Sequence, residues 1–246
     1  MSSYQTFASV YDLFMDNVPY DRWCGDICRI LKDNGINEGL ILDLACGTGR
    51  LTRLLADEGY DMIGIDASAD MLSAARKAEN AMGHKAFKGD EPRILYLCQD
   101  MREFELYGTV RAVICACDSL NYILEPKELY KVFRLVNNYL DPDGIFIFDM
   151  NLPVKYEDIL SDNTFAENRE DCSFIWENSF DALTRLNEFD LTLFIKDGEI
   201  YHRYEEIHCQ RSYEPDEVRD LLKEAGLDFE MIASDEERFY ALSRRI

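Results

Sequence analysis

The stretch that decides the fold covers residues 39–50 and reads GLILDLACGTGR. Residues 40–44 are apolar except for Asp43, a composition typical of a strand that is buried on both faces of a parallel sheet. Gly47 and Gly49 then allow a tight turn, and leucines at 51, 54 and 55 follow at the spacing of one helix face. The stretch therefore predicts a strand, a glycine turn and a helix, which is the repeating unit of α/β sheets.

The same alternation of strand and helix continues on both sides of this unit. Apolar runs predict further strands at 60–65, 94–98, 110–115 and 145–149. Ser68 and Pro126 are placed to begin the intervening helices, and Pro215 begins another before the two predicted strands at 227–233 and 238–243. Seven strands with interleaved helices indicate an α/β fold whose sheet is mostly parallel and covered by helices on both faces.

The hydrophobic period changes between these two blocks. Apolar residues alternate with polar ones at 174–180 and 189–195, and Asp197-Gly198 is a strong hairpin signal before 200–207. We therefore predict one domain formed by residues 1–150 and 211–246, and a small antiparallel β insert at 151–210 that forms a lid. The insert carries five Lys and Arg against 14 Asp and Glu, a net charge of −9.

Composition excludes several classes of partner. The 246 residues carry 26 Lys and Arg against 48 Asp and Glu, a net charge of −22, which repels nucleic acids and anionic lipids. Apolar runs are shorter than a membrane span, and the first basic residue is Arg22, so we expect a soluble cytoplasmic protein with no membrane partner. The eight cysteines are not matched by second Cys or His pairs at zinc-ligand spacing, so no metal site is expected. Nothing in the sequence specifies an oligomeric state.

Three consecutive strand ends carry residues suited to a nucleoside ligand. Gly47 and Gly49 leave no Cβ against a ligand, and the following helix presents its first N–H groups to it. Asp66 can accept both hydroxyls of a ribose, and Asp100 can accept from an adenine amino group. A nicotinamide dinucleotide site would need a third glycine where Thr52 stands. The acidic Asp43 also suits a cationic amino acid moiety better than a pyrophosphate.

The sequence resembles the class I S-adenosylmethionine (SAM) dependent methyltransferases. Four strings occur in that family's order: LDLACGTG at 42–49, IGIDAS at 63–68 followed by Met71, CQDM at 98–101, and DPDGIFIFD at 141–149. The opening aromatics, the CDSLNYI string at 117–123 and the β-rich insert look like a bacterial branch of small methyltransferases. The resemblance implies a Rossmann-like fold and SAM as the cofactor.

It also implies a role for each matching residue. The methionine part of SAM is expected at the turn of Asp43, Ala45, Cys46, Gly47 and Gly49, and the ribose at Asp66. The adenine is expected among Ala67, Met71 and Met101 with Asp100 at its edge. Cys117 and Asp118 should face the reactive methyl, and Tyr11 and Trp23 match an aromatic flap over the cofactor. Packing of helices on the sheet explains the same aromatics equally well.

The predicted reaction is an in-line transfer of the methyl group to nitrogen or oxygen of a small molecule, in which alignment supplies much of the catalysis. Asp118, His202 and His208 are the candidate bases if the acceptor must first lose a proton. The acidic insert favours a neutral or cationic acceptor. Asp118-Ser119-Leu120-Asn121 stands where nucleic-acid methyltransferases carry their catalytic motif, which argues against a nucleic acid substrate. The alternatives are a non-catalytic SAM-binding module, a protein methyltransferase and a nicotinamide-dependent reductase.

Overall fold

A seven-stranded sheet forms the centre of the protein, in a computed structural model that describes residues 18–82, 87–88, 91–92 and 94–246. The strand order is β12-β13-β7-β6-β1-β2-β5, and β13 runs antiparallel to both of its neighbours. The fold prediction is therefore confirmed. The strands are β1 (Leu40–Leu44), β2 (Asp61–Asp66), β5 (Ile94–Cys98), β6 (Val110–Cys115), β7 (Leu140–Asn151), β12 (Glu230–Ser234) and β13 (Arg238–Arg244).

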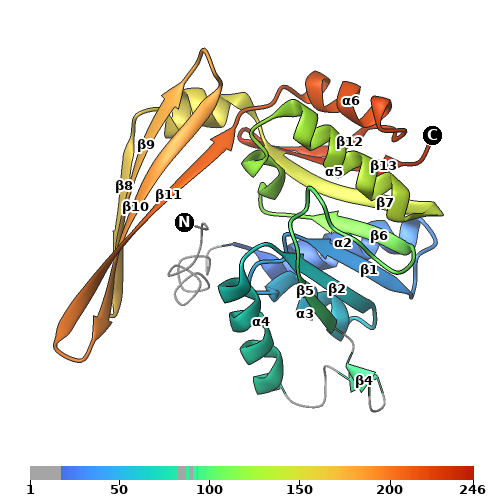
Figure 1. Cartoon of the computed structure of the whole chain (residues 1–246), viewed down its shortest axis with the longest axis horizontal. Coiled ribbons are helices and arrows are strands. Elements are labelled where there is room, and N and C mark those ends of the chain that lie inside the picture. Colours follow the sequence, from blue (N-terminus) through green and yellow to red (C-terminus); the bar gives the residue numbers. More distant parts are fainter. Residues whose placement is uncertain (1–17, 83–86, 89–90, 93) are drawn as a thin grey trace.

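Helices cover both faces of this sheet (Figure 1). Successive residues of a strand point to opposite faces, so Leu42 packs with α5 and α6 while Ile41 packs with α2, α3 and α4. Each helix presents an apolar stripe to the sheet, as α2 does with Cys24, Ile27 and Leu31. The helices are α2 (Tyr20–Asp33), α3 (Arg50–Asp57), α4 (Ala69–Met82), α5 (Pro126–Tyr139) and α6 (Pro215–Glu224).

A second, four-stranded antiparallel sheet projects from one end of the molecule, between β7 and α6 (Figure 1). Its strands are β8 (Thr164–Asn168), β9 (Cys172–Asp181), β10 (Leu186–Asp197) and β11 (Ile200–Arg211), joined to β7 through the π-helix η4 (Lys155–Leu160). Three of these strands were predicted, and β8 was not. Its sequence, TFAEN, carries no apolar alternation, and it becomes a strand because it pairs along β9.

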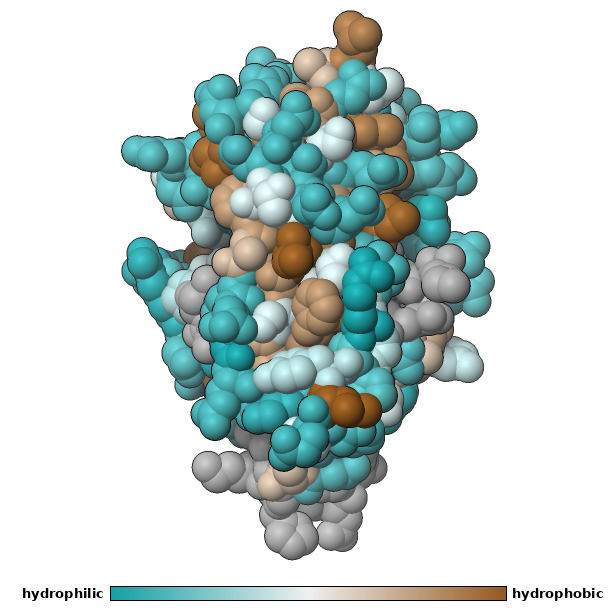
Figure 2. All heavy atoms as spheres, turned by 90° about the vertical axis from the view of Figure 1, so that its left-hand side faces the viewer, coloured by the Kyte–Doolittle hydropathy of each residue, from teal (hydrophilic) through white to brown (hydrophobic). Residues whose placement is uncertain are grey.

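The side of the molecule that carries this insert is largely hydrophilic, with apolar side chains gathered along its middle (Figure 2). Ile175, Ile200 and Ile207 are exposed large apolar residues of the insert. None of the helices in the described residues combines the length and apolarity needed to cross a bilayer.

Two predicted boundaries differ from the structure for local reasons. The predicted turn at 141–144 is absorbed into β7, which begins at Leu140 and bulges before its register with β6 resumes at Ile145. The strand predicted at 227–233 begins at Glu230, and Leu227 before it makes only an isolated bridge to Arg245.

Candidate functional site

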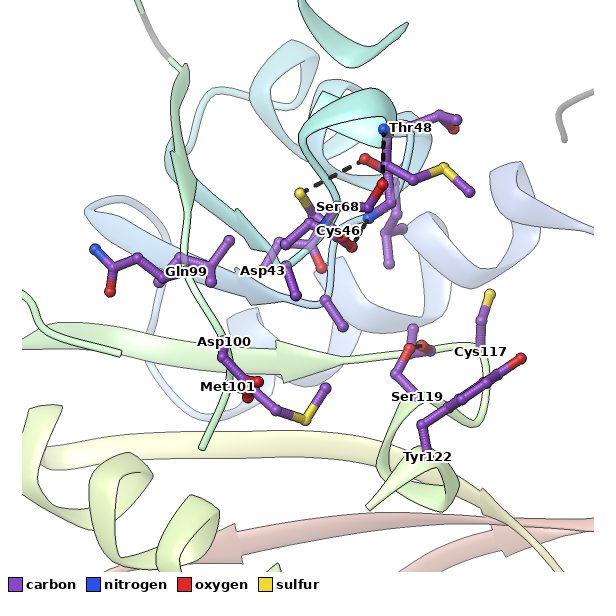
Figure 3. A pocket seen from close by; sticks show the side chains of 18 of the residues that line it. Asp43, Cys46, Thr48, Ser68, Gln99, Asp100, Met101, Cys117, Ser119 and Tyr122 are labelled. Atoms are coloured by element: carbon purple, nitrogen blue, oxygen red, sulfur yellow. Dashed lines mark hydrogen bonds between the residues drawn. The ribbon is translucent and has the colours of Figure 1, made fainter. Parts of the chain in front are cut away.

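A cavity of about 500 Å³ opens where β1, β2, β5 and β6 end (Figure 3). β2, which follows β1 in the chain, lies on one side of β1 in the sheet, and β6 lies on its other side. The cavity therefore sits where the strand order reverses. Ligands bind at this point in open α/β sheets, and the volume is typical of a small-molecule site.

The turn between β1 and α3 forms the floor of the cavity. Ala45, Gly47 and Gly49 all adopt left-handed backbone angles, with φ of 62°, 55° and 69°. A Cβ at Gly47 would meet no atom within 4 Å, whereas one at Gly49 would lie 2.5 Å from the Tyr96 hydroxyl. Gly47 is therefore the glycine whose missing side chain leaves room in the cavity, and Gly49 lets the helix pack on β5.

The carboxylate of Asp66 organises this turn from the end of β2. Its Oδ2 accepts the Gly47 N–H at 2.8 Å, and its Oδ1 accepts the Ser68 N–H at 2.8 Å. Burial raises the pKa of Asp66, and the two backbone N–H groups partly oppose that rise. Each oxygen keeps a second lone pair, so the carboxylate is still able to accept a pair of ribose hydroxyls.

Asp43 lies buried at the end of β1 and also lines the cavity. The Thr52 hydroxyl donates to its Oδ2 at 2.5 Å. Burial raises the pKa of Asp43 to about 7, and the nearby charge of Asp66 adds to the rise while the Thr52 hydrogen bond lowers it. A cationic ligand beside Asp43 would stabilise the ionised form of this buried carboxylate.

The raised pKa of Asp43 predicts that affinity for SAM rises with pH. The ionised form of Asp43 goes from roughly a tenth to nine tenths of the molecules between pH 6 and pH 8, so affinity should rise by up to about tenfold. Calorimetric titration of the wild type and Asp43→Asn tests this, since the amide keeps an acceptor for Thr52 but cannot ionise. A pH profile that is equally steep in Asp43→Asn would contradict the assignment.

The same pKa shift makes the stability of the ligand-free protein fall with rising pH, whereas the affinity for SAM rises. Because the folded-state pKa of Asp43 is raised, its contribution to the stability of the ligand-free protein is full below the unfolded pKa of about 4. That contribution is lost as the pH rises to about 7.

The side of the cavity predicted to hold adenine is lined by Ala67, Met71 and Met101. Ser68 caps α4 as predicted, accepting the Met71 N–H at 3.2 Å. Asp100 is held in its own loop, where it accepts the Arg102 N–H at 2.8 Å and forms an ion pair with that side chain. The hydrogen bonds from the Arg102 side chain lower the pKa of Asp100.

The opposite wall comes from the end of β6 and the short 3₁₀ helix η3 (Ser119–Tyr122). Cys117, Ser119 and Tyr122 line it, and Figure 3 shows them across the cavity from Met101. Burial raises the pKa of the Cys117 thiol, and so do the nearby carboxylates Asp149 and Asp118. Arg238 opposes this rise in pKa, so the charged groups behind this wall are two carboxylates and one guanidinium.

The structure places the three candidate bases differently. Asp118 sits between two lining residues, but its carboxylate accepts from Arg238 and Gln210. His208 is buried, stacks on Phe189 and has its ring 6.1 Å from that of Tyr122. His202 is exposed near the hairpin of the insert, 3.5 Å from Asp197, and does not line the cavity.

Most of the predicted cofactor residues meet in this one cavity. Ten of them line it: Asp43, Ala45, Cys46, Gly47, Asp66, Ala67, Met71, Asp100, Met101 and Cys117. Gly49 does not line it and packs on Tyr96 instead. Trp23 packs edge-on against Tyr20 and lies under the Arg238 guanidinium, outside the cavity, and Tyr11 lies outside the described residues.

Tyr20 and Arg50 line the cavity and were missed by the sequence reasoning. The Arg50 guanidinium lies 4.8 Å from the centre of the Tyr20 ring, and the Tyr20 hydroxyl is 3.8 Å from the Cys117 Sγ. Arg50 is the last residue of the stretch 39–50, so its position directly after the glycine turn could have identified it from the sequence as a residue of the site. Tyr20 is one of several nearby aromatics, and the sequence alone does not rank them.

The residues present fit SAM. The side chain missing at Gly47 leaves open space, the buried Asp43 suits a positive charge, and Asp66 retains acceptor capacity for a diol. Within the described part of the chain, no three His, Cys, Asp or Glu side chains form a group that could hold a metal ion.

Comparison with known proteins agrees with this fit. Residues 41–144 match the family described as "Methyltransferase domain". The chain is 38% identical over 234 residues to the methyltransferase-family protein YqeM of Bacillus subtilis (strain 168), covering 94% of this chain and 89% of YqeM. It also superposes with a TM-score of 0.85 on an S-adenosylmethionine-dependent methyltransferase from Clostridium acetobutylicum ATCC 824, at 30% identity and 99% coverage of both chains.

A more distant relative carries a defined substrate in its name. The dTDP-3-amino-3,6-dideoxy-alpha-D-glucopyranose N,N-dimethyltransferase of Streptomyces fradiae is 29% identical over 145 residues, which are 58% of this chain and 52% of that protein. The fold, the cavity and the full-length relatives agree, and the chain belongs to the class I S-adenosylmethionine-dependent methyltransferases.

Proposed function

We propose that this enzyme methylates an amine nitrogen of a small-molecule acceptor. When bound, SAM supplies an electrophilic methyl group on a positively charged sulfur. Transfer to a neutral amine moves that positive charge onto the acceptor nitrogen, whereas transfer to an oxygen anion removes it. The electrostatics of the wall opposite Met101 therefore bear on which acceptor is favoured.

The observation that carries the proposal is the excess negative charge behind this wall. Asp118 and Asp149 are both ion-paired with the single guanidinium of Arg238, so this group of three side chains has one uncompensated negative charge when both carboxylates are ionised. Both carboxylates raise the pKa of Cys117, which lines the cavity. A negative field there stabilises a nitrogen that becomes positive during transfer and disfavours an anionic acceptor.

Two further features support the amine. The insert, with its net charge of −9, adjoins the same end of the molecule and favours neutral or cationic acceptors. The Streptomyces fradiae relative is named as an N,N-dimethyltransferase of an amino sugar. Asp118 acts in this proposal through its charge, because both of its oxygens are engaged by Gln210 and Arg238.

The test is methyl transfer from SAM with a radiolabelled methyl group to matched acceptor pairs. Each pair consists of an amine and the compound with a hydroxyl in its place, drawn from amino sugars, amino acids and aryl amines. We expect label in the amine members only, at a rate that rises with pH for amino sugars and amino acids as the amine loses its proton, but not for aryl amines, which are already neutral. Label confined to the hydroxyl members would overturn the proposal.

A further inference from the structure

Two adjacent residues at the end of β6 hold an unusual backbone conformation. Cys117 and Asp118 both lie in the left-handed region, with φ of 61° and 49°, and neither is glycine. Such angles are uncommon for a side chain like that of Cys, and two in succession persist only when surrounding contacts fix them. We call Cys117–Asp118 the wall turn, since it leads into η3 and Cys117 lines the cavity.

The first set of contacts comes from the sheet. The Asp118 N–H donates to Asp149 Oδ2 at 2.9 Å, and Arg238 Nη2 donates to Asp118 Oδ1 at 2.6 Å. Arg238 Nη1 also donates to Asp149. The side chains of Arg238 and Asp149 are only 14% and 4% exposed, so solvent screens these contacts little.

The second set comes from the base of the insert. Gln210 of β11 donates its amide Nε2 to Asp118 Oδ2 at 2.8 Å, and Asn121 of η3 donates Nδ2 to the carbonyl of Arg211 at 2.8 Å. Gln210 and Asn121 are both buried. The side-chain amide oxygen Oε1 of Gln210 in turn accepts from the Tyr156 hydroxyl at 3.1 Å, which fixes the orientation of the amide.

We propose that Gln210 and Asn121 are positioning residues that couple the insert to the wall of the cavity lined by Cys117, Ser119 and Tyr122. Since β11 holds Asp118 of the wall turn through the Gln210 side chain and holds η3 through the Arg211 carbonyl, a shift of the insert moves Cys117 and Ser119. Binding of an acceptor against the insert and binding of SAM in the cavity are then energetically linked. The inference rests on the family assignment and not on the choice of nitrogen as acceptor.

The test reverses one hydrogen bond of the network. Gln210→Glu keeps an acceptor for Tyr156 but removes the donor to Asp118 and places two carboxylates together. In the double variant Asp118→Asn with Gln210→Glu, the new amide donates to the new carboxylate, and the net charge equals that of the wild type. The swap therefore restores the bond with its direction inverted.

Two readouts report on the wall turn without any acceptor. They are the amide exchange of residues 117–122 and the rate at which iodoacetamide alkylates Cys117, resolved from the other cysteines by peptide mass spectrometry. We expect Gln210→Glu to raise both rates by about threefold or more and the double variant to return both toward the wild type.

Asn178→Leu is the matched control for insert stability. Asn178 is buried in β9, where its Nδ2 donates to the Asn163 carbonyl at 3.1 Å and its Oδ1 accepts from Asn187 at 3.2 Å, and neither partner belongs to η3. It should lower the melting temperature and leave both readouts at residues 117–122 unchanged. The proposal fails if Gln210→Glu leaves both readouts unchanged, if Asn178→Leu raises them equally, or if the double variant gives no recovery. If Gln210→Glu does not fold, Gln210→Met takes its place with the same expectation.

Discussion

Asp66→Ala is expected to weaken SAM binding by roughly 12- to 160-fold, which corresponds to about 1.5–3 kcal/mol for hydrogen bonds that involve a charged group. The substitution removes the acceptor for the ribose hydroxyls. It also removes the acceptor of the Gly47 and Ser68 N–H groups, so the turn that forms the cavity floor loses its anchor. Isothermal titration with SAM at fixed pH measures the effect.

Asp61→Ala is the control for this experiment. Asp61 is the first residue of β2 and Asp66 is its last, so Asp61 lies at the end of the strand away from the cavity. The control therefore removes a carboxylate from the same strand without changing a residue that lines the cavity. We expect it to bind SAM as the wild type does, and Asp66→Asn, which keeps one acceptor oxygen, to be intermediate. Wild-type affinity in Asp66→Ala would refute the ribose assignment.

Arg238→Met is expected to destabilise the fold by about 3–5 kcal/mol, the range for removing one partner of a buried ion pair. The substitution leaves Asp118 and Asp149 close together with no cation between them. Burial already raises the pKa of Asp149, and the charge of Asp118 adds to that rise while Arg238 opposes it. Urea unfolding of the ligand-free protein measures the loss.

The pH dependence of this loss has a defined sign. An acid whose folded-state pKa is raised favours the folded state when protonated, so the penalty in Arg238→Met should be larger at pH 8 than at pH 5. Neutralising both acids in the Arg238→Met background should recover part of the stability. Arg219→Met is the control, because it breaks an exposed pair with Asp216 and should change stability by about 1 kcal/mol or less. An Arg238→Met loss as small as that control would contradict the argument.

Local sequence rules were sufficient to predict the sheet and most of the residues, proposed to hold the cofactor, that line the cavity. The glycine turn, Asp66 and Met101 lie at or shortly after the carboxyl ends of their strands, and parallel strands bring these ends together. Once the strands were identified, their order in the sheet was enough to bring these residues together.

The remaining residues depend on contacts between distant parts of the chain. Arg238 meets Asp118 across 120 positions, and Gln210 meets it across 92. No periodicity encodes such pairs. β8 was missed for a related reason, since pairing with β9 and not its own composition makes it a strand.

The position of β13 has a consequence for how the protein matures on the ribosome. β13 is the last of the seven strands to be synthesised, yet it lies inside the sheet between β7 and β12. Domains generally fold as units, and a nascent chain that ends before residue 238 exposes the edge of β7 and has no guanidinium between its two acids. Pairing of β13 with β7 and the contacts of Arg238 with Asp118 and Asp149 are therefore expected to form only after the parallel strands have been synthesised.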